Sequence, residues 1–356
     1  MRRRGFIMTG LAAGLASATL TAPARGAARF IVPAEEHPQD MTIMQWPVSR
    51  DVYDDAAFLR IVQATIADIA NAVVAFQPVA VLADVSHHAT ARKRLSSQVM
   101  LWDVPTDDLW ARDSGPIVLR DGAGNRAVRN IRFNGWGGRQ DHTNDGKIAT
   151  RMAERLGFDL LPSALQGEAG GVEQDGHGLL IAHESSWVHE NRNPGLSRDA
   201  VGAALLDAYG ADRILWSPGL KDEDITDYHI DSLLRLTGPG RALINMPATS
   251  YADDPFHIAA GQTLDMAKAA GLDVDVIYEP VRRRVKSVDF VASYANYYVC
   301  NGAVIAAQFG DADADTAAKA ALVRHYPGRE VITLNVDALG EIGGGIHCAT
   351  HEVPAA

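Results

Sequence analysis

From Phe30 onward, short apolar runs alternate with longer stretches that have the apolar spacing of a helix. A short apolar run is typical of a buried strand, whereas apolar residues three and four positions apart form one face of a helix. The strand-like runs are Val79–Ala83, Gly178–Ala182, Arg241–Pro247 and Ala303–Gln308, and the helix-like stretches are Asp55–Phe76, Lys147–Leu156, Ser197–Tyr209 and Asp315–Tyr326. This alternation predicts the α/β class. Because no linker-like or low-complexity run interrupts residues 30–356, we expect a single domain there.

Loop residues set among turn glycines or aromatics recur in this region at intervals of about 60 residues. They are Trp46, Asp113, Glu168, His229, Tyr294 and Cys348. Such a period is longer than the common solenoid repeats, but it is expected if similar units each send one loop to a shared centre. The spacing alone does not decide between such units and coincidence.

The charge balance argues against nucleic acid as a partner, because phosphate binding needs a cationic face. The chain holds 33 Lys+Arg against 44 Asp+Glu, and its first 29 residues contain five arginines and no acid. Subtracting those five from 33 leaves 28 basic against 44 acidic residues in the rest. With 47% hydrophobic and 22% charged residues, the composition is that of a folded globular protein.

Residues 1–27 have the features of an export signal that is cleaved from the mature protein. The run Arg3-Arg4-Gly5-Phe6-Ile7 resembles a twin-arginine signal, which is read by machinery that exports folded proteins. The apolar stretch Ile7–Leu20 is too short and too weakly apolar for a spanning helix, and no cysteine follows it for lipid attachment. We therefore expect a periplasmic or secreted protein without a membrane anchor. The alternative is a cytoplasmic chain with a frayed basic N-terminus.

Cys348 is the candidate nucleophile, because it follows the glycine run Gly343-Gly344-Gly345 near the end of the chain. Glycines let backbone N–H groups approach a substrate closely. The thiolate is the reactive species, so a cationic partner or a donor loop has to hold it ionised. Free cysteine is also among the most buried residue types, which is the interpretation we favour for Cys300. Two cysteines without C-x-x-C spacing form neither a disulfide framework nor a usual zinc or redox site.

Two groups of residues contain metal-ligand types, but neither has the spacing of a metal site. His347, Cys348 and His351 lack further ligands at a usual distance along the chain. His183 and His189 are separated by more than the helical H-E-x-x-H motif allows. We expect no metal and no organic cofactor.

Carboxylates, an imidazole and tryptophans lie in the short loops. They are Asp113, Glu168, Asp231, His229, Trp110 and Trp136. If residues 229–231 are extended, His229 and Asp231 point to one face, where an imidazole beside a carboxylate exchanges protons near neutral pH. Each candidate has a structural alternative, such as a solvated acidic turn at 229–231, a pairing of Arg112 with Asp113, or an ordinary glycine turn.

Taken together, these loops offer one thiol, one imidazole and three carboxylates. Carboxylates around a thiol raise its pKa and reduce its reactivity. The combination is chemically sensible if the substrate is itself a cation. A guanidinium group suits it, because carboxylates grip its planar fork through paired hydrogen bonds and its charge favours the thiolate.

Seven motifs in this order resemble the agmatine deiminases and the bacterial peptidyl-arginine deiminases of the guanidine-modifying superfamily. They are Met44-Gln45-Trp46-Pro47, Trp110-Ala111-Arg112-Asp113, Phe133-Asn134-Gly135-Trp136-Gly137-Gly138, Asn191-Arg192-Asn193-Pro194, Thr226-Asp227-Tyr228-His229-Ile230-Asp231, Ser293-Tyr294-Ala295-Asn296-Tyr297-Tyr298 and the loop Gly343–Cys348. The resemblance covers nearly the whole chain after the export segment. It implies a five-bladed pseudo-symmetric α/β propeller, the pentein fold, with one catalytic domain over residues 30–356.

The resemblance also implies roles for the candidate residues. Cys348 attacks the guanidinium carbon, and Asp113 and Asp231 hold the guanidinium nitrogens. His229, oriented by Glu168, protonates the departing ammonia and then activates water against the covalent thiouronium intermediate. The residues expected to contact the substrate are Trp46, Trp110, Trp136 and Gly345. The partner is a small cationic guanidino substrate, and the oligomeric state, including a homo-oligomer, stays open.

Departures from the family pattern leave the substrate open. Gly345 stands where Asn or Ser is usual, and Tyr228 and Ser232 replace a more usual Gly and Asn. Conversion of agmatine to N-carbamoylputrescine, a step in putrescine and polyamine metabolism, is the leading hypothesis. Deimination of peptidyl-arginine is the alternative, since export is less typical of biosynthetic agmatine enzymes. A non-catalytic periplasmic protein that binds polyamines or guanidines is a further alternative.

Overall fold

The computed structural model describes residues 29–48, 52–249, 252–287 and 289–356. The expected export segment at residues 1–27 lies outside the described residues, as does its cleavage site.

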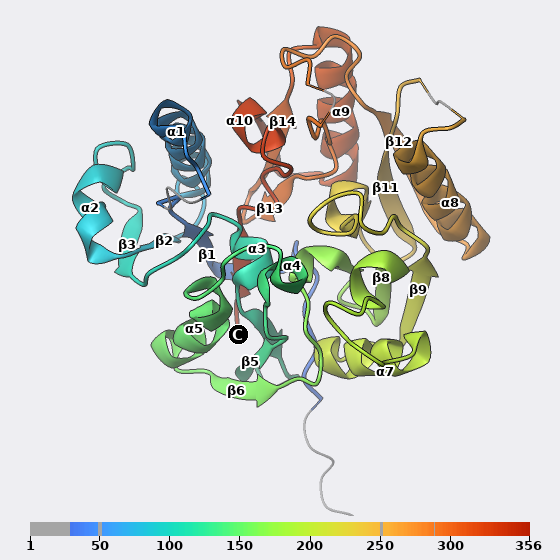
Figure 1. Ribbon diagram of the computed structural model, residues 1–356, viewed down its shortest axis with the longest axis horizontal. Coiled ribbons are helices and arrows are strands. Elements are labelled where there is room, and N and C mark those ends of the chain that lie inside the picture. Colours follow the sequence, from blue (N-terminus) through green and yellow to red (C-terminus); the bar gives the residue numbers. More distant parts are fainter. Residues whose placement is uncertain (1–28, 49–51, 250–251, 288) are drawn as a thin grey trace, which may run out of the picture.

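In the described part of the chain, the strands form five small sheets arranged around a common centre (Figure 1). In each sheet, a first strand pairs antiparallel with a central strand, and the central strand pairs parallel with the next one. The connection between the central strand and its parallel partner is helical, and the larger helices lie at the periphery of Figure 1. This repeated unit is a blade. The predicted five-bladed α/β propeller is confirmed.

The elements follow one another blade by blade. The first blade has β16 (His351–Pro354), β1 (Gln39–Gln45), β2 (Val79–Ala83) and β3 (Met100–Asp103), with α1 (Ala56–Val73) and α2 (Val85–Ala91). The second has α3 (Ala111–Ser114), β4 (Ile117–Arg120), β5 (Arg126–Asn130), α4 (Gly135–Gly138), the 3-10 helix η1 (Asp145–Lys147), α5 (Ile148–Leu156) and β6 (Asp159–Pro162). The third has η2 (Ala169–Gly171), β7 (Val172–Gln174), β8 (Leu179–His183), α6 (Glu184–Trp187), α7 (Arg198–Tyr209) and β9 (Arg213–Ser217).

The remaining blades repeat the pattern. The fourth has η3 (Ile230–Ser232), β10 (Leu234–Leu236), β11 (Arg241–Met246), α8 (Pro255–Ala269) and β12 (Asp273–Tyr278). The fifth has β13 (Tyr298–Cys300), β14 (Ala303–Gln308), α9 (Ala312–His325), β15 (Glu330–Asn335) and α10 (Asp337–Gly340).

The last strand of the chain closes the ring. β16 pairs antiparallel with β1, so it supplies the first strand of the first blade from the other end of the sequence. A further backbone hydrogen bond joins the Ala355 N–H to the Pro38 carbonyl. The closure fixes the loop that carries Cys348, which leads directly into β16.

The apolar cores lie largely between neighbouring blades. One cluster joins α1 and β2 of the first blade to β14 and α9 of the fifth, and another joins β8 of the third to β10 and β11 of the fourth. Helix α1 is the one helix of the described residues whose length and composition would suffice to cross a membrane. Half of it is buried inside the protein, where Val62, Ile66 and Ile69 pack in the first of these clusters, so it serves as a core helix.

The predicted elements agree with the structure apart from their ends, which follow local capping. Helix α7 starts after Ser197, whose side-chain oxygen accepts from the Ala200 N–H, as an N-cap does. Helix α7 ends at Gly210, whose φ of 63° is the left-handed conformation that a glycine adopts without strain. Helix α9 begins at Ala312, earlier than predicted, with Asp313 and Asp315 in a first turn that favours negative charge.

The recurrence of about 60 residues corresponds to the blades. Asp113, Glu168, His229, Tyr294 and Cys348 each lie just before the first strand of a blade, that is before β4, β7, β10, β13 and β16. Trp46 is the exception, because it follows β1, which is the central strand of its blade. Its inclusion in the series was therefore wrong, since Cys348 already occupies the equivalent place in the first blade.

Candidate active site

Loops from all five blades meet at the centre of the ring. The first blade contributes Cys348, the second Asp113, the third Glu168, the fourth His229 with Asp231, and the fifth Asn296. All of these side chains except that of Cys348, which is half-buried, are almost completely buried. The catalytic residues predicted from the sequence are therefore brought together.

Cys348 lies against the side-chain amide of Asn296, a residue for which the sequence predicts no role. The Asn296 side-chain NH₂ lies 3.1 Å from the Cys348 sulfur, and its carbonyl oxygen accepts from the Cys348 N–H at 3.3 Å. The Asp231 Oδ2 is 3.7 Å from the sulfur. Burial and the carboxylates of Asp231 and Asp113 raise the pKa of the Cys348 thiol well above its usual range. In the free protein the nucleophile is therefore held as a thiol.

The position of Gly345 depends on the same amide. A Cβ atom at Gly345 would lie 2.5 Å from the Asn296 side-chain oxygen, so only glycine allows this close approach. Gly345 thus fits the loop around Cys348. The contact that explains this glycine is with Asn296, and a contact with substrate, the role expected from the sequence, stays a prediction.

His229 lies between two carboxylates. Its Nε2 is 3.3 Å from a Glu168 oxygen, and its Nδ1 is 3.7 Å from an Asp113 oxygen. Burial disfavours the charged ring, but the carboxylates of Asp113, Glu168 and Asp231 outweigh it and raise the pKa of His229 to about 9. His229 is therefore an imidazolium at neutral pH, which is the form that can donate a proton.

The extended conformation considered for residues 229–231 is not what the structure has. His229 is extended, but Ile230–Ser232 forms the 3-10 helix η3, and Asp227 and Tyr228 before it have positive φ values of 57° and 66°. Both His229 and Asp231 still face the centre. Strained backbone of this kind is often found at functional sites.

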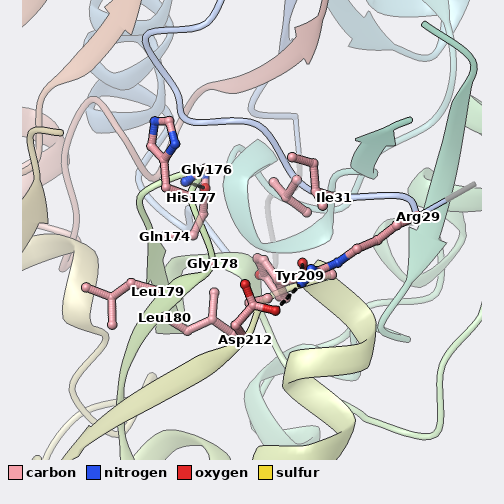
Figure 2. A pocket seen from close by; sticks show the side chains of 13 residues that line it. Arg29, Ile31, Gln174, Gly176, His177, Gly178, Leu179, Leu180, Tyr209 and Asp212 are labelled. Atoms are coloured by element: carbon pink, nitrogen blue, oxygen red, sulfur yellow. Dashed lines mark hydrogen bonds and ion pairs between the residues drawn. The ribbon is translucent and has the colours of Figure 1, made fainter. Parts of the chain in front are cut away.

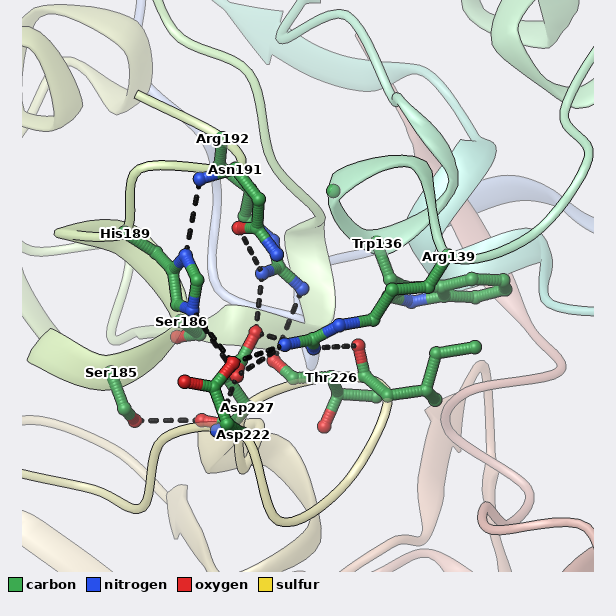
Figure 3. Close-up of polar contacts among 12 residues, drawn as sticks. Trp136, Arg139, Ser185, Ser186, His189, Asn191, Arg192, Asp222, Thr226 and Asp227 are labelled. Atoms are coloured by element: carbon green, nitrogen blue, oxygen red, sulfur yellow. Dashed lines mark hydrogen bonds and ion pairs between the residues drawn. The ribbon is translucent and has the colours of Figure 1, made fainter. Parts of the chain in front are cut away.

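Glu168 is held by a buried arginine, Arg192, which was not predicted as a site residue. The Arg192 Nε lies 3.0 and 2.8 Å from the two Glu168 oxygens, and its Nη1 donates to Asp227 at 2.6 Å. Figure 3 shows Arg192 and Arg139 converging on Asp227. Arg192 lies in the motif Asn191-Arg192-Asn193-Pro194, so the sequence marks this arginine but does not indicate what it contacts.

The two aspartates differ in how many of their oxygens the protein occupies. Asp113 accepts from the Trp136 indole N–H at 2.9 Å and from the Gly170 N–H at 3.2 Å. Burial raises its pKa to about 6. Asp231 is completely buried, and its Oδ1 has no hydrogen-bond partner in the described protein. A buried acceptor beside the thiol is therefore available to a ligand donor.

Gly170 allows the side chains of Asp113, His229 and Asp231 to lie close together. A Cβ atom there would lie 2.7 Å from the Asp113 Oδ1, 2.8 Å from the His229 Nδ1 and 3.2 Å from the Asp231 Oδ2. Any side chain at this position would therefore occupy the space that these three groups share.

Two of the predicted tryptophans, Trp110 and Trp136, contact residues of the site. Trp110 packs against Gly344 beside the sulfur, and Trp136 donates to Asp113. Trp46 has no exposed surface and packs in the cluster that joins the first and fifth blades. A contact of Trp46 with substrate, the role expected from the sequence, stays a prediction.

Arg112 and Cys300 both have structural places outside the catalytic group. Arg112 does not pair with Asp113, because its guanidinium lies 3.3 Å from Glu35 and 2.8 Å from Glu352. Cys300 is fully buried in β13, and burial raises the pKa of its thiol to about 12. It is the core cysteine that was expected.

Among the described residues, one cluster has metal-ligand types close together, namely His189, Asp222 and Asp227. Arg139 and Arg192 both donate to Asp227, so its carboxylate is already neutralised by arginines (Figure 3). These residues therefore form an ion-pair network, and we assign no metal to them.

A cavity of about 220 Å³ lies apart from the catalytic residues, where the segment from Arg29 to Val32 passes the third blade (Figure 2). The exposed ion pair between Arg29 and Asp212, at 2.6 Å, lies on its wall. None of the predicted catalytic residues lines it. The chemistry is therefore assigned to the centre of the ring.

The geometry agrees with the comparisons to known proteins. A family model described as Porphyromonas-type peptidyl-arginine deiminase matches residues 31–354. The chain belongs to this family. The deiminase chain is 30% identical to the agmatine deiminase of Pseudomonas putida, over 92% of this chain and 96% of that protein.

Solved structures agree with the fold of this deiminase. The agmatine deiminase of Enterococcus faecalis superposes with a TM-score of 0.84 at 25% identity, covering 93% of this chain and 99% of that one. A C. jejuni agmatine deiminase with substrate bound gives 0.82 at 20% identity, over 94% and 98%, which shows likeness of fold. The deiminase is thus a hydrolase that acts on guanidino groups. The alternative of a non-catalytic binding protein is wrong.

Proposed function

We propose that this deiminase hydrolyses the guanidinium group of agmatine, giving N-carbamoylputrescine and ammonia. The observation that carries the proposal is the thiol beside the carboxylates of Asp113 and Asp231. A site that raises the pKa of its own nucleophile is suited to a substrate whose positive charge reverses that effect. The guanidinium group supplies this charge together with donors for the free Asp231 oxygen.

The first half of the reaction is an addition and an elimination at the guanidinium carbon. As the cation binds, the Cys348 thiol loses its proton to solvent. The thiolate then forms a C–S bond, and the resulting tetrahedral adduct is neutral. The His229 imidazolium passes a proton to the leaving nitrogen, the C–N bond breaks, and ammonia departs. A cationic S-alkylthiouronium and a neutral His229 remain.

The second half returns the enzyme to its starting state. Neutral His229 takes a proton from water, and the hydroxide adds to the thiouronium carbon. The C–S bond breaks, the electron pair returns to sulfur, and the Cys348 thiolate regains its proton as the protonated ureido product loses one. Glu168, held by Arg192, keeps His229 in place through both steps.

The choice of agmatine is supported by the Pseudomonas putida relative, which matches nearly its whole length and is named for that reaction. Peptidyl-arginine is a second candidate, supported by the description of the matching family model. The test measures ammonia and ureido product from the mature protein with agmatine, free arginine and a peptide with C-terminal arginine. Agmatine should have the highest kcat/KM. Preference for the peptide would favour the second candidate, and no turnover of any of the three would overturn both.

We also propose that the enzyme acts outside the cytoplasm, on the basis of the twin-arginine-like run at Arg3-Arg4. Replacement of both arginines by lysine should retain the full-length protein in the cytoplasmic fraction, while the parent yields a shorter protein in the periplasm. An unshortened parent in the cytoplasm would overturn this assignment.

A further inference from the structure

His347, the residue before the nucleophile, has a buried ring held between two carboxylates. Its Nδ1 lies 2.7 Å from the Asp231 Oδ2, and its Nε2 lies 2.8 Å from the Glu35 Oε2. The His347 side chain is 3% exposed and that of Asp231 is not exposed at all. Two short contacts at opposite ends of a buried ring fix both its position and its orientation.

The contacts also determine the protonation state of the ring. Carboxylate oxygens only accept hydrogen bonds, so each ring nitrogen has to carry a hydrogen to satisfy its partner. An imidazole has two N–H groups only as the cation. The imidazolium is thus the form of His347 that satisfies both contacts at once. The pKa values of both carboxyls are lowered in spite of burial, that of Asp231 by His347 and that of Glu35 by Arg235 and His347.

Glu35 is itself anchored by several blades. It accepts from Arg235 at 3.0 Å, from Arg112 at 3.3 Å and from the Val299 N–H at 2.7 Å. Glu173 completes the set of charged groups around His347, through its ion pair with Arg235 at 2.7 Å. Glu35 comes from the segment before β1, so this segment reaches the centre of the propeller. There it supports the His347 imidazole from the side away from Asp231.

The arrangement gives the two Asp231 oxygens different tasks. Oδ2, which lies 3.7 Å from the Cys348 sulfur, is the oxygen that the His347 cation neutralises. Oδ1 has no partner within the described protein and is left for the guanidinium donors. Without the cation, a negative charge would lie uncompensated beside the sulfur, and the carboxylate would be free to rotate.

We propose that His347 is a positioning residue, a cation that Glu35 holds in place. It directs the Asp231 Oδ1 toward the substrate, and it neutralises the charge of Oδ2 beside the Cys348 sulfur. This inference rests on the proposed function, because it assigns Asp231 to the guanidinium. It extends the machinery of the site to the segment before β1, which touches no substrate.

The test compares His347→Gln and Glu35→Gln with His325→Gln in the mature protein. His325 is a matched control, because its ring also bonds through both nitrogens, to Thr237 at 2.8 Å and to Asp275 at 3.3 Å, but lies at the periphery on α9. For His347→Gln we expect kcat/KM to fall by about 10²-fold, the effect of misplacing a reacting group. Alkylation of Cys348 by iodoacetamide at a fixed pH should slow by about tenfold, equivalent to one pKa unit of the thiol.

The two remaining variants should change the alkylation rate less than His347→Gln does. Glu35→Gln should slow alkylation in the same direction but less, since His347 keeps its contact with Asp231. His325→Gln should leave both rates at the parent's value. A folded His347→Gln or Glu35→Gln protein whose alkylation profile coincides with the parent's would overturn the proposal.

A measurement on the unmodified protein keeps the proposal testable even if the variants do not fold. In ¹⁵N-histidine-labelled protein at pH 7, His347 should have both ring nitrogens protonated, and a neutral tautomer would overturn the inference. Alkylation and this spectrum need no substrate. A wrong substrate assignment would therefore leave them unchanged, whereas failure of the proposed function would appear as a parent that turns over no guanidino compound.

Discussion

At the scale of single residues, the site combines an unreactive thiol with a protonated histidine. Both states have the same cause, which is the group of carboxylates around them. These carboxylates raise the pKa of Cys348 and that of His229 together. A cationic substrate reverses the first effect at the moment when the second is needed. The resting enzyme is thus protected from neutral electrophiles and ready for a guanidinium group.

The two cysteines provide the most direct test of roles. Cys348→Ala and His229→Ala should each lower kcat by at least about 10³-fold, because removing a nucleophile or its proton donor disables the covalent route. Cys300→Ala should keep the parent's activity, since Cys300 is buried in β13. Product formation is measured with agmatine, and an active Cys348→Ala protein would contradict the mechanism.

The pH dependence follows from three groups. Asp113 has to be ionised to hold the substrate, so kcat/KM should rise steeply as the pH rises through about 6. It should continue to rise as the thiolate fraction increases. His229 has to be protonated to release ammonia, so this rise of kcat/KM should level off as the pH rises through about 9. Initial rates at low agmatine concentration give this profile, and an optimum at or below about pH 6 would contradict it.

Gly170 tests how closely the groups have to approach. Gly170→Ala places a methyl group among Asp113, His229 and Asp231 and should lower kcat/KM by about 10²-fold. Gly261→Ala is the matched control, because a Cβ atom there meets nothing within 4 Å and Gly261 lies within α8. The control should keep its activity and gain about 0.5–1 kcal/mol of stability. Equal activity of the two variants would contradict this account of Gly170.

At the scale of elements, the sequence predicts the helices and strands better than it predicts the links between loops. Val79–Ala83 and Ala303–Gln308 were predicted without error, because apolar content is a local property. Arg192, Asn296 and Glu35 were not assigned roles, because each has at least one partner in another blade. Trp46 was wrongly counted in the recurring series, because its motif was visible in the sequence but its place at the end of a central strand was not.

Arg192 links the loops of the third and fourth blades and gives a prediction at this scale. Arg192→Leu leaves the buried carboxylates of Glu168 and Asp227 without their shared cation, which should cost about 3–5 kcal/mol in the free energy of unfolding. Arg198→Leu removes only the exposed pair with Glu184 and should cost at most about 1 kcal/mol. Urea unfolding measures both, and similar values for the two variants would contradict the role of Arg192.

At the scale of the whole molecule, the ring depends on pairing between its two ends. Deletion of residues 351–356 removes β16 and leaves β1 without its antiparallel partner. We expect loss of the cooperative thermal transition and of activity, because the loop of Cys348 loses its anchor. Deletion of Ala356 alone keeps β16 and should leave both intact. A truncated protein without β16 that unfolds cooperatively at the parent's temperature would contradict the closure argument.

The contribution of one loop from each blade has a consequence for how the enzyme is made. During synthesis, Asp113, Glu168, His229 and Asn296 leave the ribosome before Cys348, and β16 follows the nucleophile. An incomplete chain therefore holds the residues proposed to bind the guanidinium group but lacks the sulfur that attacks it. Chemical competence arrives in a single step, at the moment when the ring is sealed, so no fragment of this protein that lacks its last blade strand is a deiminase.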